Sequence, residues 1–166
     1  SSSIRFWETL TEDFAPLPVI NRGFGGSTLP EVMHYAERIV FKYEPKLVVL
    51  YCGENDIAEN DPPTKVFQSF KKFIGETEKN LADVPIIFIS AKPSPDRWNL
   101  WRKYQQFNEL AYQFSTARPN LHFIDIGETL LDENGEPDTS LFIEDGLHMN
   151  REGYDGWVKK IKPMVE

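Results

Sequence analysis

A short segment near the C-terminus contains the residue types needed for proton transfer. Residues 145–148 read Asp-Gly-Leu-His, which places Asp145 three residues before His148 in a segment that can turn at glycine. A histidine titrates near neutral pH and can take a proton from a weak nucleophile, provided that a carboxylate orients the ring and stabilises its charged form. The plainer interpretation is a turn followed by an ordinary surface histidine. Whether residues 145–148 form a proton-transfer pair or only a turn depends on which residues the rest of the sequence supplies.

Three upstream segments supply the other groups that such a pair would need. Residues 1–3 are serines, residues 22–28 include three glycines, and residues 53–56 read Gly-Glu-Asn-Asp. A serine hydroxyl would be the nucleophile, and the backbone N–H of Gly26 and the side-chain amide of Asn55 would donate to an oxyanion. Each segment alone is equally well explained as a helix cap or a turn. Their joint occurrence in this order favours acyl-transfer chemistry.

The elements that must position these groups follow an alternating β and α pattern. Candidate strands rich in Val, Ile or Phe span residues 17–21, 46–52, 85–91 and 121–126, and amphipathic helices are predicted for residues 4–10, 30–41, 64–81, 98–117 and from residue 150 onward. This alternation is typical of a parallel sheet whose strands are covered on both faces. Ligands of such sheets bind beyond the carboxyl ends of the strands. We therefore expect the polar segments to meet at one edge of the sheet.

Composition restricts the class of protein. A chain of 166 residues fits one domain, here predicted to span residues 1–166. The net charge of −8 argues against nucleic acid as a partner, because a phosphate-binding surface needs clustered Lys and Arg. No apolar run approaches the roughly 20 residues of a membrane-spanning helix. The single cysteine, Cys52, excludes an internal disulfide and is expected to be buried in a strand. Oligomeric state and compartment stay open.

Other polar and aromatic residues could in principle bind a metal or a substrate. Neither His34 nor His122 has the spacing of a third metal ligand beside Asp145 and His148, so no metal and no other cofactor is expected. Glu54 and Asp56, which flank Asn55, are interpreted as a helix cap and a solvated side chain. Among the four tryptophans, Trp101 and Trp157 are predicted in the core. Trp98 is the candidate substrate-binding residue, because an aromatic face suits stacking on a sugar ring.

Taken together, residues 1–7, 21–28, 53–56 and 145–148 resemble the four ordered blocks of the SGNH, or GDSL, hydrolase family. The resemblance implies a flavodoxin-like three-layer α/β/α sandwich with a mostly parallel five-stranded sheet, and ester hydrolysis by a Ser-His-Asp triad. The first block of the family usually reads Gly-Asp-Ser, then Ile or Leu, with an aromatic residue five positions after the serine. Matching Trp7 to that aromatic makes Ser2 the nucleophile, with His148 as base and Asp145 as its partner. The implied oxyanion donors are the Ser2 N–H, the Gly26 N–H and the Asn55 side chain.

The first block departs from the family pattern in two ways. Its glycine and the strand ahead of it are missing, so the natural chain is expected to extend upstream by a strand that lies centrally in the sheet. Ser1 replaces the usual Asp, which leaves Ser3 as an alternative nucleophile. Ser1 could also act as an N-terminal nucleophile with its own amine as base, but the βα pattern and residues 145–148 would then have no role.

Two functions from different classes remain after this comparison. The first is implied by the resemblance: hydrolysis of a small-molecule ester carrying an acetyl or other short acyl group on a carbohydrate or lipid. The sequence has no long insertion that could form a lid or a deep acyl channel, which favours short chains. The second is a catalytically silent module on the same fold that binds a sugar or phosphate at the glycine loop of residues 23–26, where exposed amides could hold an anion. Labelling by a serine-directed probe would separate the two.

Overall fold

Three short parallel strands form the centre of the protein. The computed structural model describes residues 1–166, and its sheet consists of β1 (Val48–Leu50), β2 (Ile86–Ile89) and β3 (Leu121–Ile124) in the order β1-β2-β3. Val48 pairs with Ile86, and Ile86 pairs with Leu121. Every residue of β2 is buried. The run of apolar residues without alternation therefore reflects a strand that is covered on both faces, as predicted.

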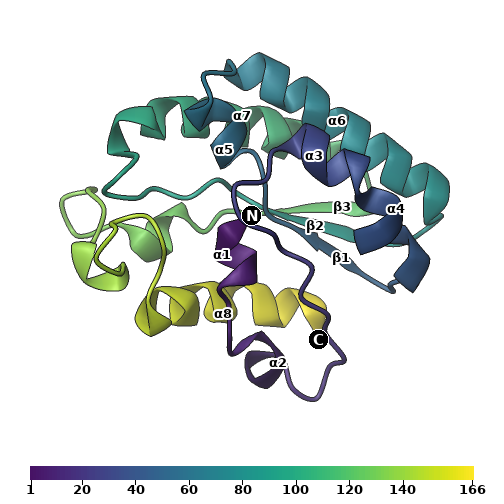
Figure 1. The fold of residues 1–166 in the computed structure, drawn as a ribbon, viewed down its shortest axis with the longest axis horizontal. Helices are drawn as coiled ribbons and strands as arrows, with labels where there is room; N and C mark the ends of the chain where they lie inside the picture. The colour runs from purple at the N-terminus through teal and green to yellow at the C-terminus, as the bar shows by residue number, and fades with distance from the viewer.

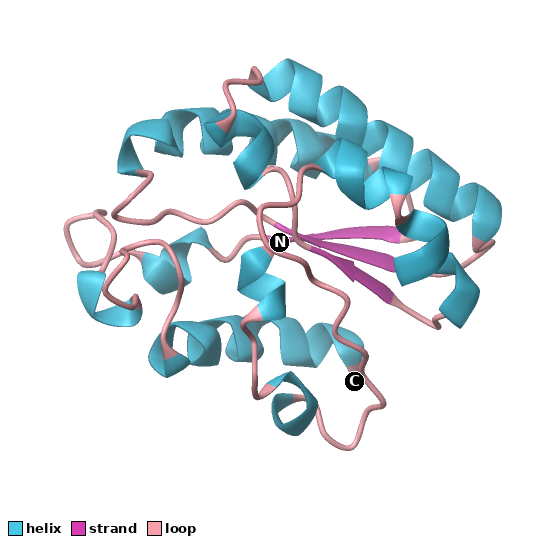
Figure 2. Ribbon diagram, in the orientation of Figure 1, coloured by secondary structure: helices cyan, strands magenta, loops and turns pink.

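Helices lie on both sides of this sheet, so the predicted α/β architecture with a parallel sheet is confirmed (Figures 1 and 2). One face carries α3 (Leu29–His34), α4 (Ala36–Ile39), α6 (Pro63–Asn80) and α7 (Trp101–Thr116), and the other carries α1 (Ser2–Arg5), α2 (Leu10–Asp13) and α8 (Arg151–Val165). The helix α5 (Glu54–Ala58) follows β1, and single 3-10 turns occupy Phe41–Tyr43, Trp98–Leu100, Gly127–Leu130 and Thr139–Leu141. None of the helices combines the length and apolarity needed to cross a lipid bilayer.

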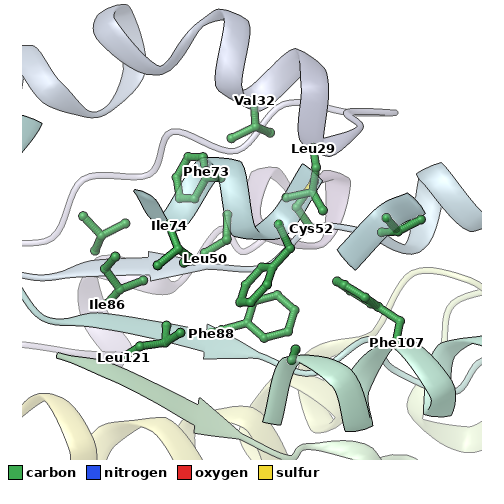
Figure 3. Close-up of a cluster of buried hydrophobic side chains, with 14 of the residues drawn as sticks. Leu29, Val32, Leu50, Cys52, Phe73, Ile74, Ile86, Phe88, Phe107 and Leu121 are labelled. Atoms are coloured by element: carbon green, nitrogen blue, oxygen red, sulfur yellow. The ribbon is translucent and has the colours of Figure 1, made fainter. Parts of the chain in front are cut away.

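Each face of the sheet has its own hydrophobic core. Successive strand residues point to opposite faces, so Ile86 and Phe88 enter one core while Ile87 and Ile89 enter the other. The larger core packs the sheet against α3, α6 and α7, with Phe73 among its buried side chains (Figure 3). The smaller core packs the opposite face against α1 and α8. Both aromatic-rich stripes of the sequence are thus explained by packing.

The predicted number of strands is wrong, because the sheet has three and not five. Residues 17–21 lie outside every helix and strand, although Leu17 and Val19 are partly buried and Pro18 and Ile20 are exposed, as in a strand. However, residues 18–21 make no backbone–backbone hydrogen bond. An extended segment without a hydrogen-bonded neighbour is not a strand, whatever its pattern of burial. The prediction places the fifth strand ahead of Ser1, outside residues 1–166.

Two predicted helices also differ from the structure. The helix predicted for residues 30–41 is interrupted at Tyr35, whose backbone leaves the helical conformation between α3 and α4. The helix predicted for residues 4–10 is replaced by two single turns, α1 and α2, joined through Trp7. A turn of four residues is not stable on its own, because nucleating a helix is costly. Packing must therefore hold α1, the element that carries Ser2.

Candidate active site

The four sequence segments meet at the carboxyl edge of the sheet, close to the start of the chain (Figure 1). The loop that follows β1 reaches the glycine loop, where the Cys52 thiol donates to the backbone oxygen of Ser27 at 3.5 Å. The glycine loop in turn reaches the first residues, since the Ser27 hydroxyl accepts a hydrogen bond of 2.7 Å from the backbone nitrogen of Ser1. Cys52 is buried, as predicted.

Ser2, His148 and Asp145 form a continuous chain of hydrogen bonds. The Nε2 atom of His148 lies 2.8 Å from Ser2 Oγ, and its Nδ1 atom lies 2.5 Å from Asp145 Oδ2. Because Nδ1 faces a carboxylate, which only accepts, this nitrogen carries the proton and leaves the lone pair of Nε2 directed at the Ser2 hydroxyl. The structure thus brings Ser2 to the Asp145–His148 pair, although Ser2 and His148 are 146 positions apart in the sequence.

Ser2 is the only one of the three N-terminal serines that reaches His148. Ser3 is buried, and Ser1 caps the helix by accepting the Ser3 N–H at 3.2 Å. The first turn of α1 therefore points Ser2 Oγ at the imidazole and turns its neighbours away. This arrangement agrees with the alignment of Trp7 on the aromatic position of the first block.

The turn of residues 145–148 is shaped by Asp145 itself. Its Oδ1 atom accepts the backbone N–H groups of Leu147 and His148, each at 2.9 Å, while Oδ2 contacts the ring. Burial acts to raise the pKa of Asp145, but the hydrogen bonds from the His148 ring and from these two N–H groups outweigh it and lower the pKa to about 2. Gly146 provides the left-handed conformation that the turn requires, with φ of 64°.

One aromatic contact at His148 was missed by the sequence analysis. The Phe6 ring meets the His148 ring edge-on, with centroids 5.0 Å apart and an angle of 79° between the planes. Phe6 lies four residues after Ser2, directly after the last residue of α1, and about half of its surface is exposed. The spacing from Ser2 is the signal that could have identified it. The contact limits rotation of the imidazole away from Ser2.

Two of the three predicted oxyanion donors are free to act. Neither the Ser2 N–H nor the Gly26 N–H donates to another group of the chain. Gly26 adopts a φ of 68°, which an L side chain rarely tolerates. A Cβ atom on the neighbouring Gly25 would lie only 4.0 Å from Ser2 Cβ, so the glycine loop passes close beside the serine. One free N–H group is therefore that of Ser2 itself, and the other lies in the glycine loop that passes beside Ser2.

The third predicted donor, Asn55, is held on both ends of its carboxamide. Its Nδ2 donates to the backbone oxygen of Ser27 at 3.0 Å, and its Oδ1 accepts from Arg97 Nη1 at 3.0 Å. An amide nitrogen has two hydrogens, so the second remains for a ligand. Arg97 was missed by the sequence analysis, which considered the following residue. The signal available was its position in the loop that follows the predicted strand of residues 85–91, at the carboxyl end of that strand.

The expectation that Glu54 and Asp56 would be a cap and a solvated side chain is wrong for both. Glu54 is 6% exposed and faces Lys92, which is completely buried, at 3.5 Å. Asp56 is 2% exposed and accepts the Leu29 N–H on both carboxylate oxygens at 3.1 Å. Both carboxylates are buried because segments from residues 29 and 92 pack over α5, which local sequence does not reveal.

The tryptophan and the two histidines named above make no hydrogen bond or ring contact with Ser2, Asp145 or His148. Trp98 is partly buried and stacks on Trp101, with ring centroids 6.1 Å apart. Its role in substrate binding stays a prediction. His34 packs against Tyr35 in α3, and His122 is exposed on β3. No group of three or more His, Cys, Asp or Glu side chains is arranged to hold a metal ion.

Comparison with known families agrees with this geometry. A profile of the GDSL-like lipase/acylhydrolase family matches residues 2–155, which is most of the chain. The chain belongs to this family. Membership in the GDSL-like family assigns the protein to the hydrolases and to ester hydrolysis in general. A comparison with curated protein sequences returned no match.

Solved structures share the fold of this GDSL-family protein. A candidate platelet activating factor from Streptococcus pneumonia has a TM-score of 0.88 at 18% identity, covering 99% of this chain and 80% of that one. A GDSL-like lipase from Bacteroides thetaiotaomicron has a TM-score of 0.77 at 24% identity, covering 99% and 82%. A variant of an acetyl-xylooligosaccharide esterase from Geobacillus Stearmophilus has a TM-score of 0.74 at 16% identity, covering 89% and 71%. At these identities the likeness establishes the flavodoxin-type hydrolase fold alone.

Proposed function

We propose that this GDSL-family hydrolase cleaves short-chain carboxylic esters through an acyl-enzyme formed on Ser2. The observation that carries the proposal is the distance of 2.8 Å between Ser2 Oγ and His148 Nε2, with Asp145 on the far side of the ring. His148 takes the hydroxyl proton as Ser2 Oγ attacks the acyl carbonyl, and then gives it to the departing alcohol. Water, activated by the same histidine, then releases the acid and restores Ser2.

Asp145 supports this cycle electrostatically. Its lowered pKa of about 2 keeps the carboxylate ionised at any pH where the protein would act. An ionised Asp145 holds the proton on Nδ1 and stabilises the imidazolium that forms when Nε2 takes the serine proton. The turn fixes the carboxylate through two backbone N–H groups, so little reorganisation is needed during the reaction.

The developing oxyanion would be held by the Ser2 N–H, the Gly26 N–H and the second hydrogen of Asn55 Nδ2. The two backbone donors have no partner within the chain, which supports this role. Such preorganised donors stabilise the tetrahedral intermediate more than the substrate, and removing one typically lowers kcat by about 10² to 10³.

The surroundings of the glycine loop support the proposed substrate class. An open hollow beside it is lined by Asn21, Arg22, Gly23, Phe24, Tyr35 and Ile39. Its two aromatic residues provide an apolar wall for the alcohol part of an ester, such as a sugar ring or a short lipid. The acyl part is proposed to be acetyl or another short chain. The acetyl-xylooligosaccharide esterase among the structural neighbours supports this choice.

A fluorophosphonate probe tests the proposal directly, because it reacts with activated serines. We expect labelling at Ser2, none in Ser2→Ala, and labelling slowed by at least about a hundredfold in His148→Ala. Ser3→Ala is the matched control, since Ser3 does not reach the imidazole, and it should label at a rate close to that of the unmodified protein. The result would be read by mass spectrometry of the labelled peptide. Absence of labelling in the folded protein would favour the silent binding module, and labelling at Ser3 would refute the assignment of Ser2.

A further inference from the structure

Arg97 makes a contact that the proposed mechanism leaves unexplained. It lies between β2 and the turn at Trp98–Leu100, and its Nη1 donates to Asn55 Oδ1 at 3.0 Å. The side chain is partly buried, and no carboxylate lies within ion-pair distance of it. In contrast, Arg118 and Arg151 both pair with carboxylates. A guanidinium held by an amide oxygen calls for an explanation other than charge neutralisation.

The two partners of Asn55 define the orientation of its amide. Arg97 can only donate and the Ser27 backbone oxygen can only accept, so Oδ1 must face the guanidinium and Nδ2 must face Ser27. The positive charge also draws electron density towards Oδ1, which makes the Nδ2–H groups better donors. Arg97 therefore acts on the free amide hydrogen through the amide group itself.

The loop that carries Arg97 is itself connected to both halves of the site. The Asp96 N–H donates to the backbone oxygen of Gly146 at 3.0 Å, which ties the loop to the turn that holds His148. Lys92, at the other end of the loop, contacts Glu54 through both its backbone nitrogen and its Nζ. One loop thus holds two consecutive residues of α5, Glu54 and Asn55. The position of Asn55 relative to His148 is fixed through it.

We propose that Arg97 is a positioning residue that holds and polarises the Asn55 amide as a donor to the oxyanion. This inference rests on the proposed function of Ser2, His148 and Asp145. Arg97 acts through Asn55, so its contribution should appear in the rate of the chemical step and should disappear when Asn55 is absent.

A double-mutant cycle on the hydrolysis of p-nitrophenyl acetate tests this dependence. We expect Arg97→Met to lower kcat about tenfold with KM changed by less than about threefold, a smaller loss than that caused by removing an oxyanion donor. In an Asn55→Ala background the same substitution should change kcat by less than about twofold. Arg97→Lys keeps a cationic donor and should recover part of the rate. Arg102→Met, at an exposed position in α7, is the control for loss of one positive charge and should leave kcat unchanged.

A readout independent of turnover is the side-chain ¹⁵N–¹H resonance pair of Asn55. In the proposed arrangement Arg97→Met shifts both resonances and speeds their hydrogen exchange, while Arg102→Met does neither. Equal loss of kcat with and without Asn55, or a rise in KM confined to anionic esters, would overturn the inference, the latter by showing that Arg97 binds substrate. Unchanged Asn55 resonances in Arg97→Met would also refute the positioning role. The proposed function has its own test, because it fails if fluorophosphonate does not label Ser2.

Discussion

At the scale of single residues, three consecutive side chains of α5 are each held by a different part of the chain. Glu54 faces Lys92, Asn55 lies between Ser27 and Arg97, and Asp56 accepts the Leu29 N–H. Successive residues of a helix point in directions about 100° apart, so one short helix can meet three neighbours. The buried carboxylates at positions 54 and 56 therefore fix the amide at position 55 from either side.

Burial of Asp56 predicts a dependence of stability on pH. Desolvation raises its pKa from 3.8 to about 6, although the hydrogen bond from Leu29 favours the ionised form. The folded state thus binds a proton that the unfolded state has released, so this group stabilises the fold below pH 3.8 and that contribution is lost as pH rises to about 6. From its shift we expect the free energy of unfolding, relative to that of Asp56→Asn, to fall by about 2 to 3 kcal/mol between pH 4 and pH 7.

Urea unfolding of the unmodified protein and of Asp56→Asn across this pH range measures the effect. The difference between their free energies of unfolding removes the contribution of the titratable groups that the two proteins share. Gln105→Ala, at an exposed position and with no titratable group gained or lost, is the control and should show a difference that does not vary with pH. A difference between the protein and Asp56→Asn that stays constant from pH 4 to pH 7 would contradict the raised pKa.

At the scale of elements, the loop after β2 is anchored by one side chain of α7. Asn108 accepts the Ala91 N–H at 2.8 Å and donates to the Ala91 oxygen at 2.9 Å, in a buried position. Asn108→Ala leaves both backbone groups unpaired, and we expect it to lower the free energy of unfolding by about 2 to 4 kcal/mol. Because the loop carries Lys92 and Arg97, kcat for p-nitrophenyl acetate should fall as well.

Gln105→Ala is the matched control for this prediction. Gln105 is exposed on the same helix, so its substitution should change stability by less than about 0.5 kcal/mol and leave kcat unaffected. Denaturation by urea and steady-state kinetics give the two quantities. An Asn108→Ala protein as stable and active as the control would show that the loop is held by other contacts.

The elements also show which parts of the fold could be predicted from the sequence. The strands expected at residues 46–52, 85–91 and 121–126 each contain an observed strand. A short run of apolar residues indicates that the segment itself is buried, so this property can be predicted from local sequence. Residues 17–21 are also mostly apolar but have no hydrogen-bonded neighbour. Whether a segment becomes a strand depends on a second segment that pairs with it, which its own sequence does not reveal. The same limit applies to the site. The residue types and order singled out Asn55, Asp145, His148 and the cluster of serines at positions 1–3, and the family resemblance selected Ser2 among these. Arg97, by contrast, matters only through a side-chain contact across 42 positions.

At the scale of the whole molecule, the site lies where the two hydrophobic cores meet. The short helix α1 is supported by the smaller core, through Trp7, and by the Tyr154 hydroxyl, which donates to the Ser3 oxygen at 2.9 Å. Asn55 is supported by α5 and the loop after β2, which pack against the larger core. Hence the two cores have separate effects on the site: one sets the position of Ser2 and the other sets that of Asn55.

A pair of matched core substitutions tests this separation. Trp157 contacts Trp7 with ring centroids 5.8 Å apart, whereas Phe73 lies in the larger core, and both side chains are fully buried. Trp157→Leu and Phe73→Leu should each lower the free energy of unfolding by about 2 to 4 kcal/mol, because both leave cavities. Under conditions where circular dichroism shows both proteins folded, kcat should fall further in Trp157→Leu, because α1 loses its support and Ser2 moves relative to His148. Equal kcat values in the two variants would mean that the position of Ser2 does not depend on which core is weakened.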